Sequence, residues 1–249
     1  MTNSPCPDIM KFAEIENKIA LRTVRQYGQV LVHAESTLAL LHEFVAEIHE
    51  TRRFFGAYLG QVINFSRLAV VSLLRLHFAQ AGWCVRYAIE ACAKAAYCIG
   101  NEDVDREVLA YNDKGIPHEN EGFSRTCYVW LKERYPKKSA KLKDAKDAVN
   151  EVFAHANINT AMSNVARHQD TLVIEPFDRL PAGRLELMLY LATYPVLVMM
   201  RILAFEINRS EDAALISSFE GRFADCVQKS RRLNLQVENI TEELGLSLD

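Results

Sequence analysis

Long stretches of this sequence place apolar residues three and four positions apart, with few residues that would interrupt a helix. The 249 residues include only 10 glycines and 7 prolines, and no proline lies between residues 8 and 116. Apolar residues at this spacing form one face of an α-helix, whereas glycine and proline are the residues that most often end one. The sequence therefore predicts an all-α, multi-helix bundle and not a turn-rich sandwich or barrel.

The periodicity divides the chain into a series of expected helices. Their predicted ranges are 8–28, 30–58, 61–80, 83–99, 103–112, 123–135, 138–156, 182–208 and 211–236. Residues 158–180 break the helical pattern, and "TLVIEPF" at 171–177 predicts a short extended segment within this insert. No repeat, low-complexity segment or linker divides the chain. We therefore expect a single helical domain over 1–249, with its core at 8–236 and a C-terminal tail, 237–249, that is either mobile or docked.

The overall charge and the cysteine content are those of an ordinary reduced globular protein. Hydrophobic residues make up 49% of the chain and charged residues 24%, and the net charge is −3. This balance predicts no obligatory polyanion partner for the chain as a whole. The six cysteines form no Cys-x-x-Cys pair, and four of them lie in apolar helical patterns. Cysteine there behaves as a small buried hydrophobe, so we expect a cytoplasmic protein.

Neither the first residues nor the most apolar segment indicates a membrane protein. The first residues, "MTNSPCPDIMKFAEIENK", lack the basic and then apolar segments of a secretory signal. The one segment that could be considered for a membrane span, "LMLYLATYPVLVMM" at 187–200, has fourteen uncharged residues and contains Pro195. Crossing a bilayer takes about 20 apolar residues. We therefore expect this segment to be a buried core helix, and the protein to be soluble with no membrane partner.

One predicted helix carries charged and aromatic side chains on the same side. In "WCVRYAIEACAKAAY" at 83–97, Arg86, Glu90 and Lys94 stand four residues apart, and at about 100° per residue they stay on one face. The aromatic residues on or beside that face are Trp83, Tyr87 and Tyr97. Small or apolar residues make up the opposite face, and this predicts a close helix contact there. They are Ala81, Cys84, Ala88, Ala91, Cys92, Ala95 and Ile99.

Three interpretations of the charged face stay open. Ion pairs of Glu90 with Arg86 and with Lys94, each at i,i+4, would make it a salt-bridged stripe with a structural role. A partly buried polar network would instead join this helix to its neighbours. The third interpretation is a binding or catalytic site. We prefer the structural interpretation.

A second candidate position lies where the helix predicted at 138–156 ends. There "HANIN" at 155–159 supplies the imidazole of His155 and the amides of Asn157 and Asn159. In the simpler interpretation the amides close the helix end. In the alternative, His155 points into a pocket that it shares with Arg86 and Glu90.

The strongest local charge is the run "KERYPKKSAKLKDAK" at 132–146. It holds seven Lys or Arg residues against two acidic ones. Its residues Lys137, Lys138 and Lys141 are candidates for binding phosphate groups, as along an RNA track, although a solvated helix start explains the run as well. A smaller second patch consists of Lys229, Arg231 and Arg232.

The motifs of several common enzyme classes are missing. The sequence contains no GxxxxGK(S/T), GxGxxG or GxSxG motif. No glutamate is followed three residues later by histidine, as the di-iron bundles require. "HEFVAEIHE" at 42–50 gathers five acidic or histidine residues on one predicted helix, and we interpret them as a solvated charged face. We therefore expect no metal site and no cofactor.

Three short motifs carry a resemblance to a known group of proteins. "RYAIEACAKAAY" at 86–97, "FAHANIN" at 153–159 and "IEPFD" at 174–178 resemble bacterial all-helical proteins with an Arg-x-x-x-Glu helix and a later helix end that contains histidine. These proteins are distantly similar to the HEPN superfamily, which includes toxin and phage-defence ribonucleases alongside inactive binding members. The resemblance covers residues 75–180 and implies a helical fold.

This sequence departs from the HEPN ribonuclease signature, in which an arginine precedes a histidine by four to six intervening residues. None of the seven histidines has an arginine at that distance, and Asn150 occupies the nearest equivalent place before His155. Without that guanidinium, Arg86 or another residue would have to stabilise the charge that develops on the phosphate. The resemblance therefore supports the fold more strongly than it supports nuclease activity.

Our expectation for the function follows from the lack of a complete catalytic motif. We expect a binding or regulatory module of a bacterial defence or toxin-related system, forming a homodimer through its long apolar helices, with an RNA or protein partner. The alternative is a metal-independent ribonuclease, with His155 as acid and base, Arg86 as phosphate clamp and Glu90 as orienting partner. A third class, a small-molecule sensor, predicts an enclosed pocket lined by Trp83, Tyr87 and Tyr97.

Overall fold

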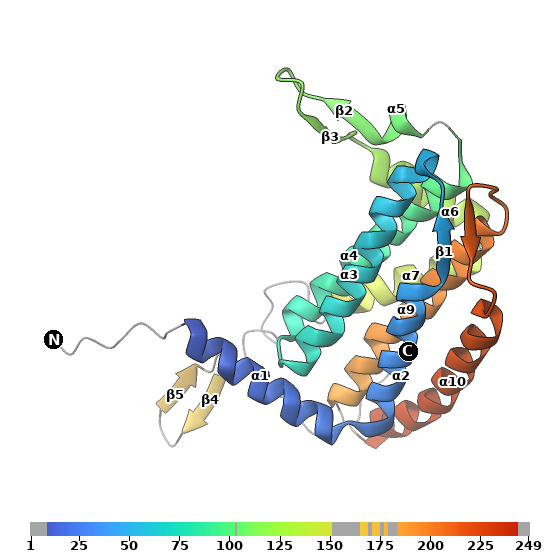
Figure 1. The fold of residues 1–249 in the computed structure, drawn as a ribbon. Coiled ribbons are helices and arrows are strands. Elements are labelled where there is room, and N and C mark those ends of the chain that lie inside the picture. The colour runs from blue at the N-terminus through green and yellow to red at the C-terminus, as the bar shows by residue number, and fades with distance from the viewer. Residues whose placement is uncertain are drawn as a thin grey trace.

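The computed structural model describes residues 9–102, 104–150, 165–168, 171–174, 177–178 and 184–243. Helices dominate these residues, which confirms the prediction of an all-α multi-helix bundle (Figure 1). The main helices are α1 Ile9–Gln26, α2 Gly28–Glu43, α3 Arg53–Leu74, α4 Phe78–Gly100, α6 Phe123–Arg134, α7 Pro136–Val149, α9 Arg184–Ile207 and α10 Phe219–Glu243. Two short helices are η1 Glu50–Arg52 and α5 Asp105–Val108.

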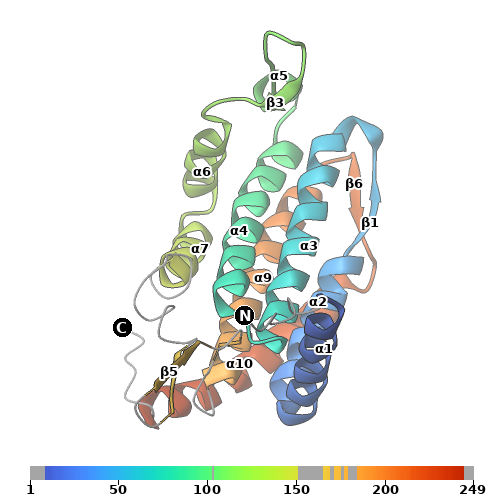
Figure 2. The same cartoon turned by 90° about the vertical axis from the view of Figure 1, so that its left-hand side faces the viewer.

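Helix α9 is the core of the bundle. It contacts α2, α3, α4, α7 and α10, and Figure 2 shows it running behind α3 and α4. Leu189, Met200, Ile202 and Leu203 of this helix are fully buried. By length and composition alone, two segments of the described residues are apolar enough to cross a membrane, Glu50–Leu74 and Leu185–Ile207. The second is mostly buried by the other helices, as expected for the core helix predicted at 187–200.

The small-residue face of α4 lies inside the bundle, as the sequence predicts. Ala81, Cys84, Ala88, Ala91, Cys92, Ala95 and Ile99 are all buried. The Sγ atom of Cys92 lies 4.0 Å from the carbonyl oxygen of Met199 in α9. Small side chains allow the backbones of two helices to approach this closely.

The prediction of one helix over 30–58 is wrong, because the chain leaves the helical conformation after Glu43. Strand β1, Val45–Ile48, pairs antiparallel with β6, Ala213–Leu215, which also replaces the predicted start of the last helix. An ion pair of 2.8 Å between Arg52 and Asp212 closes this connection. The five charged or histidine residues of "HEFVAEIHE" therefore do not share one helix face.

Two further hairpins interrupt the helices. Strand β2, Leu109–Tyr111, pairs with β3, Pro117–Glu119, where the sequence predicts a helix to residue 112 and a loop. Strand β4, Val165–His168, pairs with β5, Thr171–Ile174, and this hairpin confirms an extended segment in the insert at 158–180. The two hairpins extend from opposite ends of the bundle (Figure 1).

The end of the insert is fixed against the start of α4. The carboxylate of Asp178 accepts a hydrogen bond of 2.6 Å from the backbone N–H of Phe78, and the Asp178 N–H donates to the carbonyl of Leu76. The ring of Phe177 stacks on Phe12 of α1, with the ring centroids 5.4 Å apart. The insert thus satisfies a free N–H of the first turn of α4.

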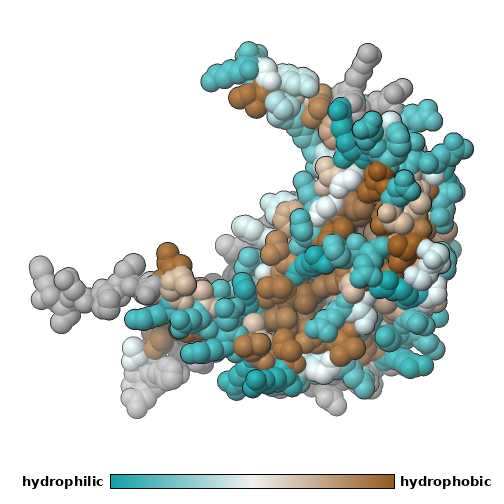
Figure 3. Space-filling view, viewed as in Figure 1, coloured by the Kyte–Doolittle hydropathy of each residue, from teal (hydrophilic) through white to brown (hydrophobic). Residues whose placement is uncertain are grey.

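One face of the described structure leaves apolar side chains exposed. Figure 3 shows apolar surface gathered on the side of α3 that faces the viewer, between α1 and the β2–β3 hairpin. Leu68 and Val71 of α3 are 45% and 38% exposed. The homodimer through the long apolar helices remains a prediction.

Candidate functional site

The described residues of α7, α9 and α10 enclose a groove of about 770 Å³. Its floor is apolar and comes mainly from α9, with Phe223 and Val227 of α10 on one wall. The lining residues of α9 are Leu187, Tyr190, Leu191, Tyr194, Leu197, Val198 and Arg201. This volume falls within the range of roughly 300–1,000 Å³ that is typical of pockets for small molecules.

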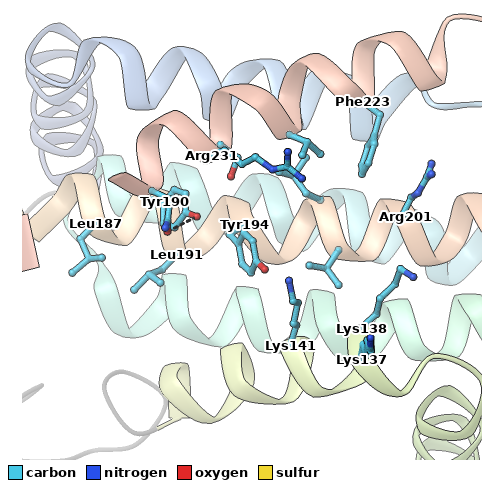
Figure 4. A pocket seen from close by; sticks show the side chains of 15 residues that line it. Lys137, Lys138, Lys141, Leu187, Tyr190, Leu191, Tyr194, Arg201, Phe223 and Arg231 are labelled. Carbon is cyan, nitrogen blue, oxygen red and sulfur yellow. Dashed lines mark hydrogen bonds between the residues drawn. The ribbon is translucent and has the colours of Figure 1, made fainter. Parts of the chain in front are cut away.

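Five cationic side chains line the groove. Figure 4 shows Lys138 and Lys141 reaching toward α9 from α7, with Lys137 beside Lys138, and Arg231 lying on the opposite wall. The fifth cation is Arg201 of α9. The two basic patches of the sequence, 132–146 and 229–232, therefore meet at one groove, although about 90 residues separate them in the chain. The three lysines are those that the sequence singles out as candidate phosphate-binding residues.

Most of these cations have no acidic partner. Arg201 donates two hydrogen bonds, of 2.8 and 2.9 Å, to the carboxylate of Glu220. Within the described part of the chain, no carboxylate forms an ion pair with Lys137, Lys138, Lys141 or Arg231. The groove therefore carries uncompensated positive charge.

Aromatic rings hold several of the cations in place. The Nζ atom of Lys138 lies 4.7 Å from the ring centroid of Phe205, and the guanidinium of Arg201 lies 4.8 Å from the same centroid on α9. The Nζ atom of Lys141 lies 5.8 Å from the ring centroid of Tyr194. Cation–π contacts of this kind fix a charged group without neutralising it.

Burial and neighbouring charge both disfavour the protonated form of Lys138. Its partial burial lowers the pKa of the ammonium group, and the positive charges of Arg201 and Lys141 lower the pKa further. An anion placed among these three side chains would offset the repulsion between them and favour the protonated form of Lys138. The arrangement thus favours a negatively charged ligand.

The tyrosines of the floor are packed and oriented. Tyr190 and Tyr194 stack with their ring centroids 6.0 Å apart, and the Tyr190 hydroxyl donates a hydrogen bond of 2.9 Å to Oδ1 of Asn234 in α10. Tyr190 is only 7% exposed and Phe223 only 9%. Neither ring offers an open face on which a nucleic-acid base could stack.

Sequence reasoning missed the contribution of α9 to the groove. Tyr190 and Tyr194 lie in the segment 187–200, which we interpret as a core helix, and Arg201 directly follows that segment. A signal was present, since at about 100° per residue Tyr190, Tyr194 and Arg201 fall within about 40° of one another. A core helix with two tyrosines and an arginine on one face has a polar face, not a uniformly buried surface.

The charged face of α4 forms a polar network that joins three helices. Glu90 accepts a hydrogen bond of 3.1 Å from Nε of Arg86 and forms an ion pair of 2.8 Å with Lys146 of α7. Lys146 also donates to the hydroxyl of Tyr128 in α6, at 3.2 Å. Lys94 does not take part, because it pairs with Glu119 of β3 at 2.7 Å. The observed arrangement corresponds to the second of the three interpretations.

This network keeps Glu90 ionised. Burial alone would raise the pKa of the Glu90 carboxyl, but the hydrogen bonds and charges of Lys146 and Arg86 outweigh it and hold the pKa below its ordinary value. Nη1 of Arg86 lies 3.5 Å from Oδ1 of Asn150, at the end of α7. His155 and Asn157 lie outside the described residues, so that the convergence of His155 with Arg86 and Glu90 stays a prediction.

Within the described residues, the three aromatic residues of α4 do not gather around one cavity, which disfavours the sensor hypothesis. Trp83 and Tyr87 are about half exposed, and Tyr87 stacks on Phe65 of α3 at 5.3 Å. Tyr97 is buried, and its hydroxyl donates a hydrogen bond to the carboxylate of Glu107. Since fourteen residues separate Trp83 from Tyr97, they lie about 21 Å apart along the helix.

The described residues offer no metal site, and two of their buried thiols are not activated. No group of three or more His, Cys, Asp or Glu side chains within them is arranged to hold a metal ion. The five cysteines of the described structure, Cys84, Cys92, Cys98, Cys127 and Cys226, are buried. Burial raises the pKa of the Cys92 and Cys127 thiols, so these two sulfurs are not thiolate nucleophiles at neutral pH.

Comparisons of the chain with protein-family models, with curated proteins and with solved structures gave no match. The resemblance to the HEPN superfamily therefore stays a prediction. The function has to be argued from the groove between α7, α9 and α10 itself.

Proposed function

We propose that the protein is a binding or regulatory module that takes a small anionic ligand in the groove between α7, α9 and α10. The observation that carries this proposal is the cluster of lysines without acidic partners. Proteins usually pair or solvate the cations that they hold close together, because like charges repel more strongly beside apolar surface than in water. Here Lys138 and Arg201 lie over the same ring of Phe205 beside an apolar floor, and the positive charges of Arg201 and Lys141 lower the pKa of Lys138.

Calorimetric titration with inorganic pyrophosphate tests the proposal. We expect the double variant Lys138→Gln/Lys141→Gln to bind pyrophosphate at least about tenfold more weakly than the wild type, which corresponds to roughly 1.4 kcal/mol for the loss of two charge contacts. We also expect binding to weaken as salt is raised, because the groove is open to solvent.

The matched control is Lys143→Gln. Lys143 lies on the same helix, pairs with Asp147 at 2.6 Å and does not line the groove. The substitution Lys143→Gln removes one positive charge from α7 without changing a residue of the groove. Wild-type protein that does not bind pyrophosphate, or a control as weak as the double variant, would contradict the proposal.

The metal-independent ribonuclease is the second candidate, supported by the contact of Arg86 with Asn150. This contact brings Arg86 to a residue five positions before His155 in the chain. The candidate predicts that mixed RNA is degraded in EDTA by the wild type and survives with His155→Ala. Because Glu90 holds Arg86 and Lys146 in ion pairs, we expect equal RNA survival with the two proteins. Faster RNA loss with the wild type would favour the enzyme over the binding module.

A further inference from the structure

Charge and apolar surface are unevenly distributed along the groove. Figure 4 shows Lys137, Lys138 and Arg201 near one end, and Leu187, Tyr190 and Leu191 near the other. Both ends belong to the same face of α9, and the fourteen residues from 187 to 201 span about 21 Å of helix. A ligand that fills the groove must therefore carry its charge at one end and apolar surface at the other.

The charged end fits a group with more than one negative charge. Lys138 and Arg201 both lie over the ring of Phe205, at 4.7 and 4.8 Å from its centroid, and Lys141 follows three residues further along α7. Arg201 is already engaged by Glu220, which leaves the compact ammonium groups of the lysines to bind the ligand. Lysine binds phosphate as a point charge, and a phosphate monoester with nearly two negative charges compensates such a cluster better than a single carboxylate.

The apolar end fits an aliphatic chain better than an aromatic base. The ring of Tyr190 at this end is packed against the protein and is less than a tenth exposed. Leu191, in contrast, is 37% exposed and lines the groove. A flexible alkyl chain can lie along such a surface of leucine and ring edges, whereas base stacking requires an open ring face.

We propose that the ligand is a soluble single-chain amphiphile, with a phosphate head group beside Lys138, Lys141 and Arg201 and an alkyl chain along α9 toward Leu187. This inference rests on the proposed function and names the chemical class of its ligand. A free amphiphile is favoured over a membrane surface because the apolar residues line a recess between three helices. A surface that inserts into lipid would expose its large apolar side chains on a convex face.

A series of alkyl phosphates tests the inference by the dependence of affinity on chain length. Hexyl, octyl, decyl and dodecyl phosphate are titrated below their micelle concentrations, beside inorganic phosphate and the neutral detergent dodecyl maltoside. Complete burial of a methylene group would raise the affinity about fourfold. Because the groove is open on one side, we expect about a twofold gain per methylene, ending once the chain fills the groove.

Two variants separate the head group from the chain. Leu191→Gln should flatten the dependence on chain length and leave the binding of inorganic phosphate unchanged, whereas Lys138→Gln/Lys141→Gln should weaken every phosphate by a similar factor. The matched control is Leu68→Gln, because Leu68 is a comparably exposed leucine on α3 that does not line the groove. It should behave as the wild type.

The outcomes distinguish this inference from the proposed function. If pyrophosphate binds through Lys138 and Lys141 but chain length has no effect, the anion-binding function stands and the amphiphile is excluded. If neither pyrophosphate nor the alkyl phosphates bind, both fail. Sedimentation with phosphatidic acid vesicles that depends on the two lysines, without binding of free alkyl phosphates, would overturn the inference in favour of a membrane. Displacement by single-stranded RNA, with no gain from the chain, would overturn it in favour of a nucleic acid.

Discussion

Replacing Glu206 by alanine is expected to lower the free energy of unfolding by about 3 kcal/mol or more. Glu206 lies near the end of α9 with 1% of its side chain exposed. Its carboxylate accepts hydrogen bonds from the hydroxyl of Tyr135 and from Nε and Nη2 of Arg134, and Arg209 lies 3.5 Å away. Without this carboxylate the buried hydroxyl of Tyr135 loses its acceptor and the guanidinium of Arg134 loses two hydrogen bonds.

The matched control is Glu220→Ala, which breaks an arginine pair of similar geometry at the surface. Glu220 accepts two hydrogen bonds from Arg201, but its side chain is 63% exposed. We expect that substitution to cost less than about 1 kcal/mol, because water replaces the lost contacts. Urea unfolding followed by circular dichroism measures both free energies. Equal costs for the two substitutions would show that burial does not set the strength of the Glu206 network.

The isosteric variant Glu206→Gln separates charge from volume. Glutamine fills the same space, but it presents an amide NH2 to donors that already face the side chain. We expect it to recover less than half of the loss seen with alanine, because two guanidinium groups keep no counter-charge. The neighbouring Gly100 shows how tight the site is, since a Cβ atom there would lie 2.9 Å from Oε2 of Glu206 and 2.7 Å from the ring of Trp130.

The fold class could be predicted from the sequence because helix formation here is encoded locally. Apolar residues at helical spacing define the buried faces, and the alanine and cysteine side of α4 is an example in which every predicted residue is buried. The break after Glu43 could not be predicted in the same way. "VAEI" at 45–48 becomes a strand because it pairs with Ala213–Leu215, which lies more than 160 residues away in the chain. Such short segments follow their tertiary partner and not their own propensity.

The candidate site was only partly predictable for a related reason. A run of lysines marks Lys137, Lys138 and Lys141 in the sequence, but the run does not say which of its seven cations share a surface. In the structure Lys146 turns to Glu90 and Arg134 to Glu206, while the three lysines face α9. The meeting of α7 with Arg231 depends on how α9 and α10 pack. That packing is determined by the whole bundle and cannot be predicted from the spacing of residues within one helix.

The stability of the protein is expected to fall below pH 6.5 because of His33 in α2. His33 is 1% exposed, and neither ring nitrogen has a hydrogen-bond partner among the described residues. Burial lowers the pKa of its imidazole, and the positive charge of Lys229 on α10 lowers it further. The folded state therefore holds a neutral ring under conditions where the unfolded chain, with a histidine pKa of about 6.5, takes up a proton.

The sign of the effect follows from this difference. Above about pH 6.5 the ring is neutral in both states and contributes no pH dependence. Below it only the unfolded state binds the proton, so that the free energy of unfolding falls by up to about 1.4 kcal/mol per pH unit until the folded pKa is reached. His33→Leu removes the titrating group and keeps an apolar side chain in the core. Between pH 7.5 and pH 5 we therefore expect this variant to gain about 1–2 kcal/mol relative to the wild type.

Urea unfolding at a series of pH values measures this relative gain. His42→Leu is the matched control, because His42 lies on the same helix with its side chain exposed, and it should keep the wild-type pH profile. All three proteins carry the same carboxylates, so that differences between the profiles isolate the histidine. Profiles of the wild type and His33→Leu that stay parallel from pH 7.5 to pH 5 would show that α2 and α10 separate, or admit water, at no cost when His33 is charged. Profiles that diverge would show that acid weakens the packing of α10 against α2. Because α10 forms one wall of the groove, the groove would then be sensitive to acid as well.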